Sequence, residues 1–135
     1  MILSVLVQGN EEKKSVPART DPPTWRIEFY TDSRGHSPVT EYIGALSSQE
    51  QAEVRDEIRF LREFGLQLKE PHVRQVTDHP KLWELRPGAN RIFYFAHTGR
   101  KFFLLHAYRK KSQKAPAREI RMAEKRMVEL LEETE

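Results

Sequence analysis

The most informative part of the chain is residues 81–108, which read KLWELRPGANRIFYFAHTGRKFFLLHAY. Three runs with aromatic and branched apolar residues, at 81–86, 91–97 and 101–108, are separated by the turn-forming sequences PGAN and TGR. Short connections of this kind favour antiparallel pairing of neighbouring strands. The stretch therefore predicts three consecutive antiparallel strands.

The sequence before this stretch predicts one more strand and two helices. Residues 25–30, WRIEFY, have the composition of a strand and precede the turn-forming sequence TDSRG. A first helix is expected with Ser37 as its N-cap, and a second from Ser47 or Ser48 to Gly65. Apolar residues recur at helical spacing along the second.

The expected order of elements is β-α-α-β-β-β-α. Residues 67–80 contain two prolines and are interpreted as a loop that can hold a short extended piece, and a final helix is expected from Pro116. This order is typical of an α+β domain, with a small, mainly antiparallel sheet, two N-terminal helices packed on one face, and a C-terminal helix. We expect all the helices on the same face of the sheet.

The length of 135 residues suits a single domain, which is expected over residues 25–135. Residues 1–24 contain three prolines without a period and are expected to form a flexible N-terminal extension. The chain has no cysteine and no apolar run long enough for a membrane helix, which favours a cytoplasmic protein with no membrane partner. Its five histidines lack metal-ligand spacing and no glycine-rich phosphate loop is present, so neither a metal nor a small-molecule cofactor is expected.

Positive charge is concentrated in one segment of the sequence. Residues 81–126 hold 13 Lys and Arg against 3 Asp and Glu, whereas residues 1–80 hold 10 against 13. Clustered cations bind phosphates and release their counterions, which supplies much of the affinity for nucleic acid. The segment predicts an RNA-binding surface, and an acidic protein partner is the alternative.

Strand alternation places candidate catalytic groups on one face of the sheet. Along residues 81–86, Leu82, Glu84 and Arg86 point to one side and the apolar Trp83 and Leu85 to the other, which is assigned to the core. Arg91 opens the next strand after a four-residue turn, so Glu84, Arg86 and Arg91 are expected on one surface. The alternative is a solvated strand with a cross-strand ion pair.

The sequence YRKKSQK at residues 108–114 is a second candidate element. Its cations are expected to contact phosphates, while Tyr108 is expected to stack on a base. Alternation also places His106 on one strand face with Leu104 and Tyr108, either near the basic site or as an ordinary hydrogen-bonded strand histidine. A solvated basic loop is the alternative. The expected RNA-binding residues are Tyr108, Arg109, Lys111, Lys114 and Arg118.

Two of these stretches resemble a known group of proteins. Residues 82–95, LWELRPGANRIFYF, resemble the LW-x-LR, short turn, YRI-x-Y hairpin of RelE/ParE-superfamily toxins. Residues 104–116, LLHAYRKKSQKAP, resemble the LLHAF-x-KK-x-QK-x-P ending of the phage-derived, HigB-like branch of type II toxin–antitoxin systems. The likeness covers about residues 25–129.

The resemblance implies a RelE-like fold and a toxin that inhibits translation by cutting messenger RNA on the ribosome. It implies metal-independent cleavage, in which a ribose 2′-hydroxyl attacks the adjacent phosphate. It also implies three partners: the ribosome, messenger RNA and a cognate antitoxin, expected to be of the helix-turn-helix type.

Catalytic roles follow from the resemblance residue by residue. Arg91 matches the catalytic arginine at the start of the YRI strand, and Arg86 matches the arginine that ends the preceding strand. Lys110, or its neighbour Lys111, falls near the second active-site cation and is the candidate acid or charge stabiliser.

Three positions depart from the RelE pattern. RelE has lysines where this chain has Leu82 and Glu84, so Glu84 is a possible substitute for the lysine base. The terminal tyrosine of the family has no clear counterpart, and Tyr108 is the nearest aromatic residue. Asn90 stands where Tyr or His is usual. Two other functions stay open: a ParE-like toxin that binds DNA gyrase without RNA chemistry, and a non-catalytic prophage protein that only binds a partner.

Overall fold

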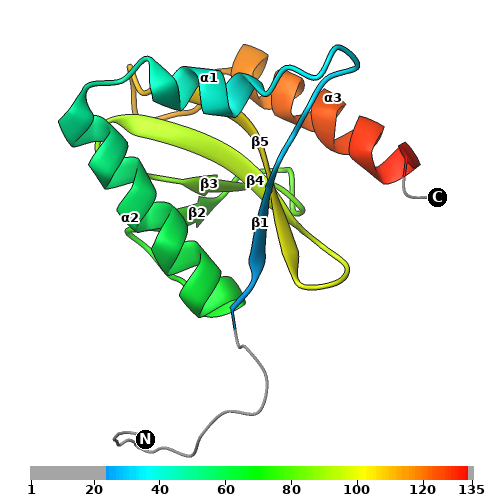
Figure 1. Ribbon diagram of the computed structural model, residues 1–135, viewed down its shortest axis with the longest axis horizontal. Helices are drawn as coiled ribbons and strands as arrows, with labels where there is room; N and C mark the ends of the chain where they lie inside the picture. The colour runs from blue at the N-terminus through cyan, green and yellow to red at the C-terminus, as the bar shows by residue number, and fades with distance from the viewer. Residues whose placement is uncertain (1–23, 134–135) are drawn as a thin grey trace, which may run out of the picture.

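The computed structural model describes residues 24–133, which form a five-stranded sheet with helices on both faces (Figure 1). The predicted extension at residues 1–24 lies outside the described residues except for Thr24. None of the helices within 24–133 has the length and apolar character that crossing a membrane requires. The elements in chain order are β1 (Arg26–Phe29), α1 (Pro38–Gly44), α2 (Ser48–Phe64), the 3-10 turn η1 (Gly65–Gln67), β2 (Val73–Gln75), β3 (Trp83–Leu85), β4 (Asn90–His97), β5 (Lys101–Arg109) and α3 (Ala117–Glu133).

The predicted α+β class and mainly antiparallel sheet are confirmed. The strand order is β1-β5-β4-β3-β2, in which only β1 and β5 pair in parallel. One strand was not predicted as such: β2 lies in the stretch interpreted as a loop, and it extends the sheet beyond β3. In that pairing Arg74 lies opposite Glu84.

Local sequence signals set the ends of the second helix. The Ser47 side chain accepts a hydrogen bond from the backbone N–H of Glu50 over 3.2 Å, as expected of an N-cap. Gly65 ends the helix with a φ of 57°, a conformation that favours glycine. Ser37 precedes α1 as predicted, but its hydroxyl contacts Thr40 instead of capping the backbone.

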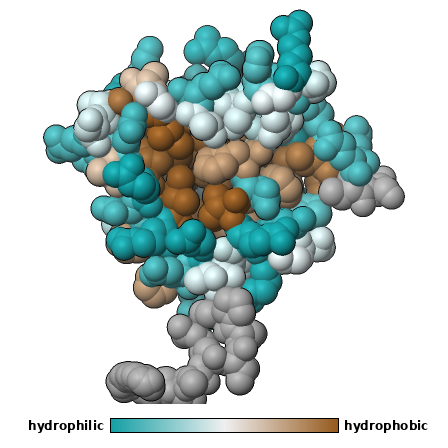
Figure 2. All heavy atoms as spheres, in the orientation of Figure 1, coloured by the Kyte–Doolittle hydropathy of each residue, from teal (hydrophilic) through white to brown (hydrophobic). Residues whose placement is uncertain are grey.

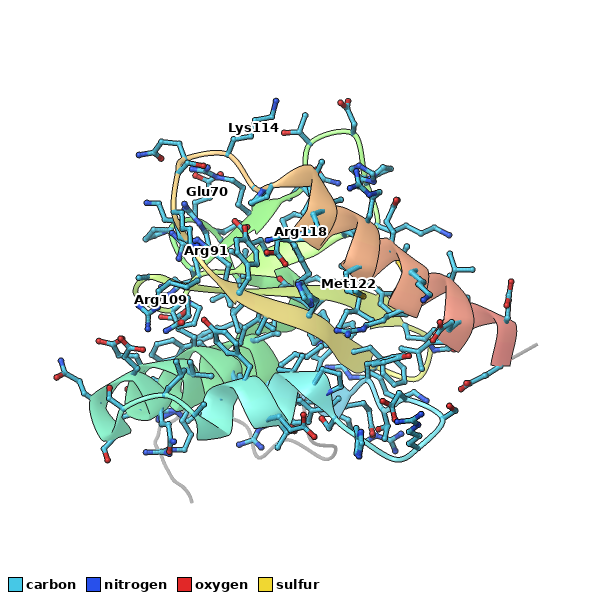
Figure 3. All side chains as sticks on the ribbon, turned by 90° about the horizontal axis from the view of Figure 1, so that it is seen from above. Glu70, Arg91, Arg109, Lys114, Arg118 and Met122 are labelled. Carbon is cyan, nitrogen blue, oxygen red and sulfur yellow. The ribbon has the colours of Figure 1, made fainter. Side chains whose placement is uncertain are left out.

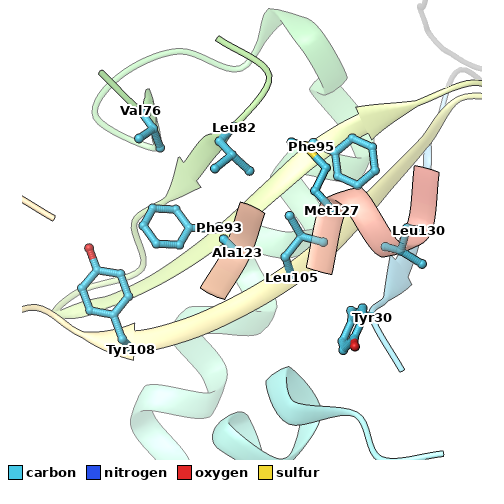
Figure 4. Close-up of a cluster of buried hydrophobic side chains, with 10 residues drawn as sticks. All are labelled: Tyr30, Val76, Leu82, Phe93, Phe95, Leu105, Tyr108, Ala123, Met127 and Leu130. Carbon is cyan, nitrogen blue, oxygen red and sulfur yellow. The ribbon is translucent and has the colours of Figure 1, made fainter. Parts of the chain in front are cut away.

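The expectation that all helices share one face of the sheet is wrong. Viewed from above, α1 and α2 lie on one side of the sheet and α3 on the other (Figure 3). Each side has its own hydrophobic core. The α1/α2 core contains Val39, Val54, Leu61, Val73, Leu85, Ile92, Tyr94, Phe102 and Leu104. The α3 core contains Tyr30, Val76, Leu82, Phe93, Phe95, Leu105, Tyr108, Ala123, Met127 and Leu130 (Figure 4).

A β-bulge changes the side-chain alternation along β5. Phe93 pairs with His106 and Tyr94 with Leu104, so Leu105 is an extra residue on β5. Leu105 packs in the α3 core and His106 contacts α3, whereas Leu104 lies in the α1/α2 core. The prediction that Leu104 shares a face with His106 and Tyr108 is therefore wrong, because the bulge resets the alternation.

Candidate active site

Four predicted or candidate residues meet on the α3 side of the sheet. Glu84 comes from β3, Arg86 follows that strand, Arg91 comes from β4, and Tyr108 pairs with Arg91 across β5. Glu84 is only 8% exposed and Arg91 6%, because α3 and its core cover this face. The alternative of a solvated strand is wrong for this face, since both faces of the sheet carry a core, but its cross-strand ion pair is present between Glu84 and Arg91. We call these four residues the Glu84 cluster.

The carboxylate of Glu84 is the centre of this cluster. Its Oε2 atom accepts a hydrogen bond from the Tyr108 hydroxyl over 2.8 Å. Its Oε1 atom lies 3.6 Å from Nε of Arg86 and 3.9 Å from Nε of Arg91. One carboxylate therefore faces two guanidinium groups, which leaves an excess positive charge in a largely buried place. Such a place favours an anion as ligand.

Arg91 is held tightly by the backbone. Its NH1 atom donates hydrogen bonds of 2.8 Å to the carbonyl oxygens of Gly88 and Asn90. Burial lowers the pKa of Arg91, and the neighbouring Arg86 lowers it further. Arg91 thus fixes the turn between β3 and β4 in addition to supplying charge.

Arg86 differs from Arg91 in its hydrogen bonding. Of the buried side-chain nitrogen and oxygen atoms in residues 24–133, only Nε of Arg86 lacks a hydrogen-bond partner. A buried donor without a partner costs roughly 1–3 kcal/mol. Oε1 of Glu84 lies 3.6 Å from this nitrogen, too far for a hydrogen bond, so a small shift of Arg86 would be needed for the donor to gain a partner.

Tyr108 is placed differently from the prediction that it stacks on a base. Its side chain is buried, and its ring packs 5.4 Å from the ring of Phe93, measured between centroids. Burial and the hydrogen bond to Glu84 raise the pKa of Tyr108 well above its ordinary value. Its hydroxyl contacts Glu84, and its ring is not exposed for stacking on a base.

The remaining predicted cations lie on different sides of the sheet. Lys111, Lys114 and Arg118 are exposed. Figure 3 shows Lys114 in the loop before α3 and Arg118 at the start of that helix. Lys110 is half-buried, and its backbone N–H donates to the carbonyl of Ala89 in the turn beside Arg91.

Arg109 lies on the α1/α2 side, where its NH2 atom contacts Oε1 of Glu50 at 2.7 Å. The hydrogen bond from Arg109 lowers the pKa of Glu50, and Asn90 contributes a weaker one. Arg109 is thus not brought together with the Glu84 cluster.

A groove opens onto Glu84 between the loop after β2 and the start of α3. We call it the β2–α3 groove. Its lining residues are Arg74, Gln75, Val76, Thr77, Asp78, His79, Glu84, Gln113, Lys114, Ala115, Ala117 and Ile120.

A comparison with protein families identifies the group to which the chain is related. Residues 41–128, more than half of the 135, match the family described as phage derived protein Gp49-like (DUF891). The chain belongs to this family. The Gp49-like proteins are a phage-derived family of RelE/HigB-like toxins, and a toxin of this kind has an antitoxin as its partner. No curated protein matches the sequence.

The segment that matches the Gp49-like family contains every predicted catalytic and RNA-binding residue, from Glu84 to Arg118. It also contains Arg74 and the loop after β2, which were not predicted as part of the site. The apolar residues Val73 and Val76 indicate a short strand, but the prolines around them favoured a loop. Among the described residues no group of three His, Asp or Glu side chains is arranged to hold a metal ion.

His106 of this Gp49-like chain is an internal hydrogen-bonded residue. Its Nε2 atom lies 2.5 Å from Oε1 of Glu119, and its Nδ1 atom lies 3.2 Å from NH1 of Arg126. Because arginine only donates hydrogen bonds, Nδ1 accepts and the Nε2–H donates to Glu119. Burial lowers the pKa of His106, which favours this neutral form. The interpretation as a hydrogen-bonded strand histidine fits these contacts.

Proposed function

We propose that this Gp49-like protein is a HigB-like toxin that inhibits translation by cutting messenger RNA on the ribosome. The observation that carries the proposal is the Glu84 cluster, where two guanidinium groups face one carboxylate and Nε of Arg86 lacks a partner. A phosphate of RNA has the charge and the acceptor oxygens that this cluster needs.

The proposed reaction is transfer of a phosphoryl group within the RNA. The 2′-oxygen of one ribose forms a bond to phosphorus and the bond from phosphorus to the next 5′-oxygen breaks. The products are a 2′,3′-cyclic phosphate and a free 5′-hydroxyl. The reaction needs a base for the 2′-hydroxyl, an acid for the leaving oxygen, and cations for the charge that develops on the phosphoryl oxygens.

The contacts of Glu84 support its assignment as the base. Oε2 accepts the hydrogen bond of Tyr108, while Oε1 lies 3.6 Å and 3.9 Å from the two arginine Nε atoms, and Glu84 belongs to the lining of the β2–α3 groove. Oε1 is therefore free to accept the proton of a 2′-hydroxyl. Tyr108 holds the carboxylate in place for this step.

The cations take the remaining roles. Arg86 and Arg91 stabilise the charge on the phosphoryl oxygens, and Lys110 donates the proton to the leaving 5′-oxygen. The exposed Lys111, Lys114 and Arg118 contact neighbouring phosphates of the strand, so binding weakens as salt rises.

The decisive experiment is cleavage of messenger RNA bound to purified ribosomes, with the 5′ ends of the products mapped. Wild type should cut within the decoding site, and Arg86→Ala should lower the rate by about 10²–10³-fold, as for loss of one transition-state donor. Arg86 is preferred over Arg91 because Arg91 also fixes a turn. Arg121→Ala, an exposed arginine on α3 outside the groove, is the control of equal charge.

Other outcomes would contradict the proposal in distinct ways. Growth arrest on expression without RNA cuts would favour the gyrase-binding alternative. Absence of both arrest and cuts would favour a protein that only binds a partner.

We further propose that the antitoxin is a helix-turn-helix protein that covers the basic surface through opposite charge and burial. Co-purification of the two proteins at low and moderate salt tests this. Failure to co-elute under both conditions contradicts it.

A further inference from the structure

The β2–α3 groove has the properties of a pocket for a flat, polar-edged ligand. We propose that it receives one unstacked RNA base next to the phosphate that is cut, and so sets the sequence preference of the toxin. This inference rests on the proposed function, because the base belongs to the same RNA strand.

The groove has apolar walls that suit the face of a base. Val76 is 8% exposed, Ile120 is half-buried, and Ala115 and Ala117 add small side chains at its mouth. A base stacked on such walls leaves its ring edge pointing to the polar residues. Stacking alone tolerates any base, so the preference has to come from that edge.

The polar lining offers both donors and acceptors for such an edge. Gln113 comes from the loop before α3 and Gln75 from β2, and a carboxamide presents an acceptor oxygen and a donor NH₂. Gln75 uses its Nε2 atom to donate to the carbonyl of Pro80 over 2.8 Å, which fixes the orientation of this side chain. Fixed amides of this kind distinguish one base from another.

The groove is formed before any ligand arrives. The loop after β2 is fixed by backbone hydrogen bonds of 3.0 Å from Val76 to Leu82 and of 3.1 Å from His79 to Val76. Nδ1 of His79 lies 2.6 Å from Oε2 of Glu124 on α3, so one contact joins the two walls. A rigid pocket of fixed width loses little entropy on binding.

The groove holds two cations that suit the phosphates flanking a base, beside the carboxylates of Asp78 and Glu84. Arg74 lies opposite Glu84 in the pairing of β2 with β3, and Lys114 stands on the other wall. These cations can contact the phosphates on either side of the base. Because Glu84 belongs to the lining, the bound nucleobase would lie next to the carboxylate that is proposed to take the proton from the 2′-hydroxyl.

The test is a map of cut sites on ribosome-bound messenger RNA that presents every codon. Ala117→Trp fills the mouth of the groove, and Met122→Trp places the same ring on α3 outside it, where Met122 is 38% exposed. Ala117→Trp should lower cleavage ~10-fold or more, because the indole ring occupies the space that the RNA base needs in the pocket. Gln113→Ala should relax the base preference beside the cut, and Met122→Trp should leave rate and preference unchanged.

Thermal unfolding midpoints establish whether each variant is folded. If Ala117→Trp does not fold, Gln113→Ala alone still tests the proposal. If wild type cuts and both groove variants cut the same sites at the same rate, the pocket proposal alone is overturned. If both keep the cut pattern but lose antitoxin binding, it is overturned in favour of a peptide ligand. If wild type makes no cuts, the proposed function itself fails.

Discussion

The hydroxyl of Tyr108 on β5 reaches across β4 to donate a 2.8 Å hydrogen bond to Oε2 of Glu84 on β3. The ring of Phe93, on the strand between them, supports the tyrosine ring. This contact joins the three central strands of the sheet at the level of the candidate site. It makes the position of the Glu84 carboxylate depend on a residue that never has to contact RNA.

Replacing Tyr108 with Phe should destabilise the protein and misplace Glu84. The carboxylate is buried and would lose its hydrogen-bond donor, which costs about 1.5–3 kcal/mol for a bond to a charged group. Urea unfolding measures this as a lower midpoint with an unchanged slope. Tyr94→Phe is the control, because it removes a hydroxyl from a buried tyrosine of the α1/α2 core and keeps the ring contact with Phe102, so it should cost less. Equal stability of Tyr108→Phe and wild type would contradict the prediction.

The stability of the fold should fall as the pH falls below about 6.5, the ordinary pKa of histidine, because of His106. Burial lowers the pKa of His106 in the folded protein, so the unfolded chain binds a proton first on acidification. The contribution of neutral His106 to stability is therefore complete above the pKa that this histidine has in the unfolded chain. It is lost as the pH falls through the lower pKa that it has in the folded protein.

The measurement is the free energy of unfolding between pH 5 and 8, conditions chosen to span roughly the ordinary histidine pKa. His106→Gln keeps a donor for Glu119 and an acceptor for Arg126 but does not titrate, so its curve should be flatter. His36→Gln, at an exposed histidine, should retain the wild-type slope. A His106→Gln curve as steep as that of wild type would assign the pH dependence elsewhere.

Gly65→Ala should destabilise the protein strongly. Gly65 has a φ of 57°, and a Cβ atom there would clash with Nε1 of Trp25, whose ring stacks on Phe102. Backbone strain of this kind costs about 1–3 kcal/mol before the clash is counted. Thermal unfolding followed by tryptophan fluorescence should report both a lower midpoint and a changed environment of Trp25.

The matched control is Gly44→Ala. Gly44 ends α1, and a Cβ atom there has no neighbour within 4 Å. Its replacement should leave the midpoint unchanged or raise it slightly, since alanine favours the helix. A similar loss of stability in both variants would show that the conformation of Gly65 is not the cause.

The ion pair between Glu50 and Arg109 should contribute little to stability. The two side chains are 29% and 47% exposed, so water and salt weaken their attraction. A double-mutant cycle with Glu50→Gln and Arg109→Gln should give only a small coupling energy, and one that shrinks as salt is added. A large coupling that resists salt would mean that the pair is effectively buried.

Much of the fold could be predicted because its signals are local. The turns before Arg91 and Lys101 and the glycine after α2 are properties of a few neighbouring residues. The side of the sheet that each helix covers is not a local property of the sequence. The apolar stripe of α3 shows that it packs, but only the path of the chain decides which face it meets.

The candidate site was predicted in part for the same reason. Alternation along β3 correctly brings Glu84 and Arg86 to one side with Arg91. Their burial could not be foreseen, since it depends on α3 lying over them. Arg74 was missed because β2 has three residues and is defined by its pairing with β3, not by its own pattern.

The bulge at Leu105 lets β5 place two neighbouring residues, Leu105 and His106, on the α3 side of the sheet. Deleting Leu105 would join Leu104 to His106 and restore simple alternation, so Tyr108 would still lie opposite Arg91 and face Glu84. The deletion would instead remove one side chain from the α3 core. Relatives that lack this residue would therefore keep the contact between Tyr108 and Glu84, whereas one residue added or lost between His106 and Tyr108 would turn the tyrosine to the other face.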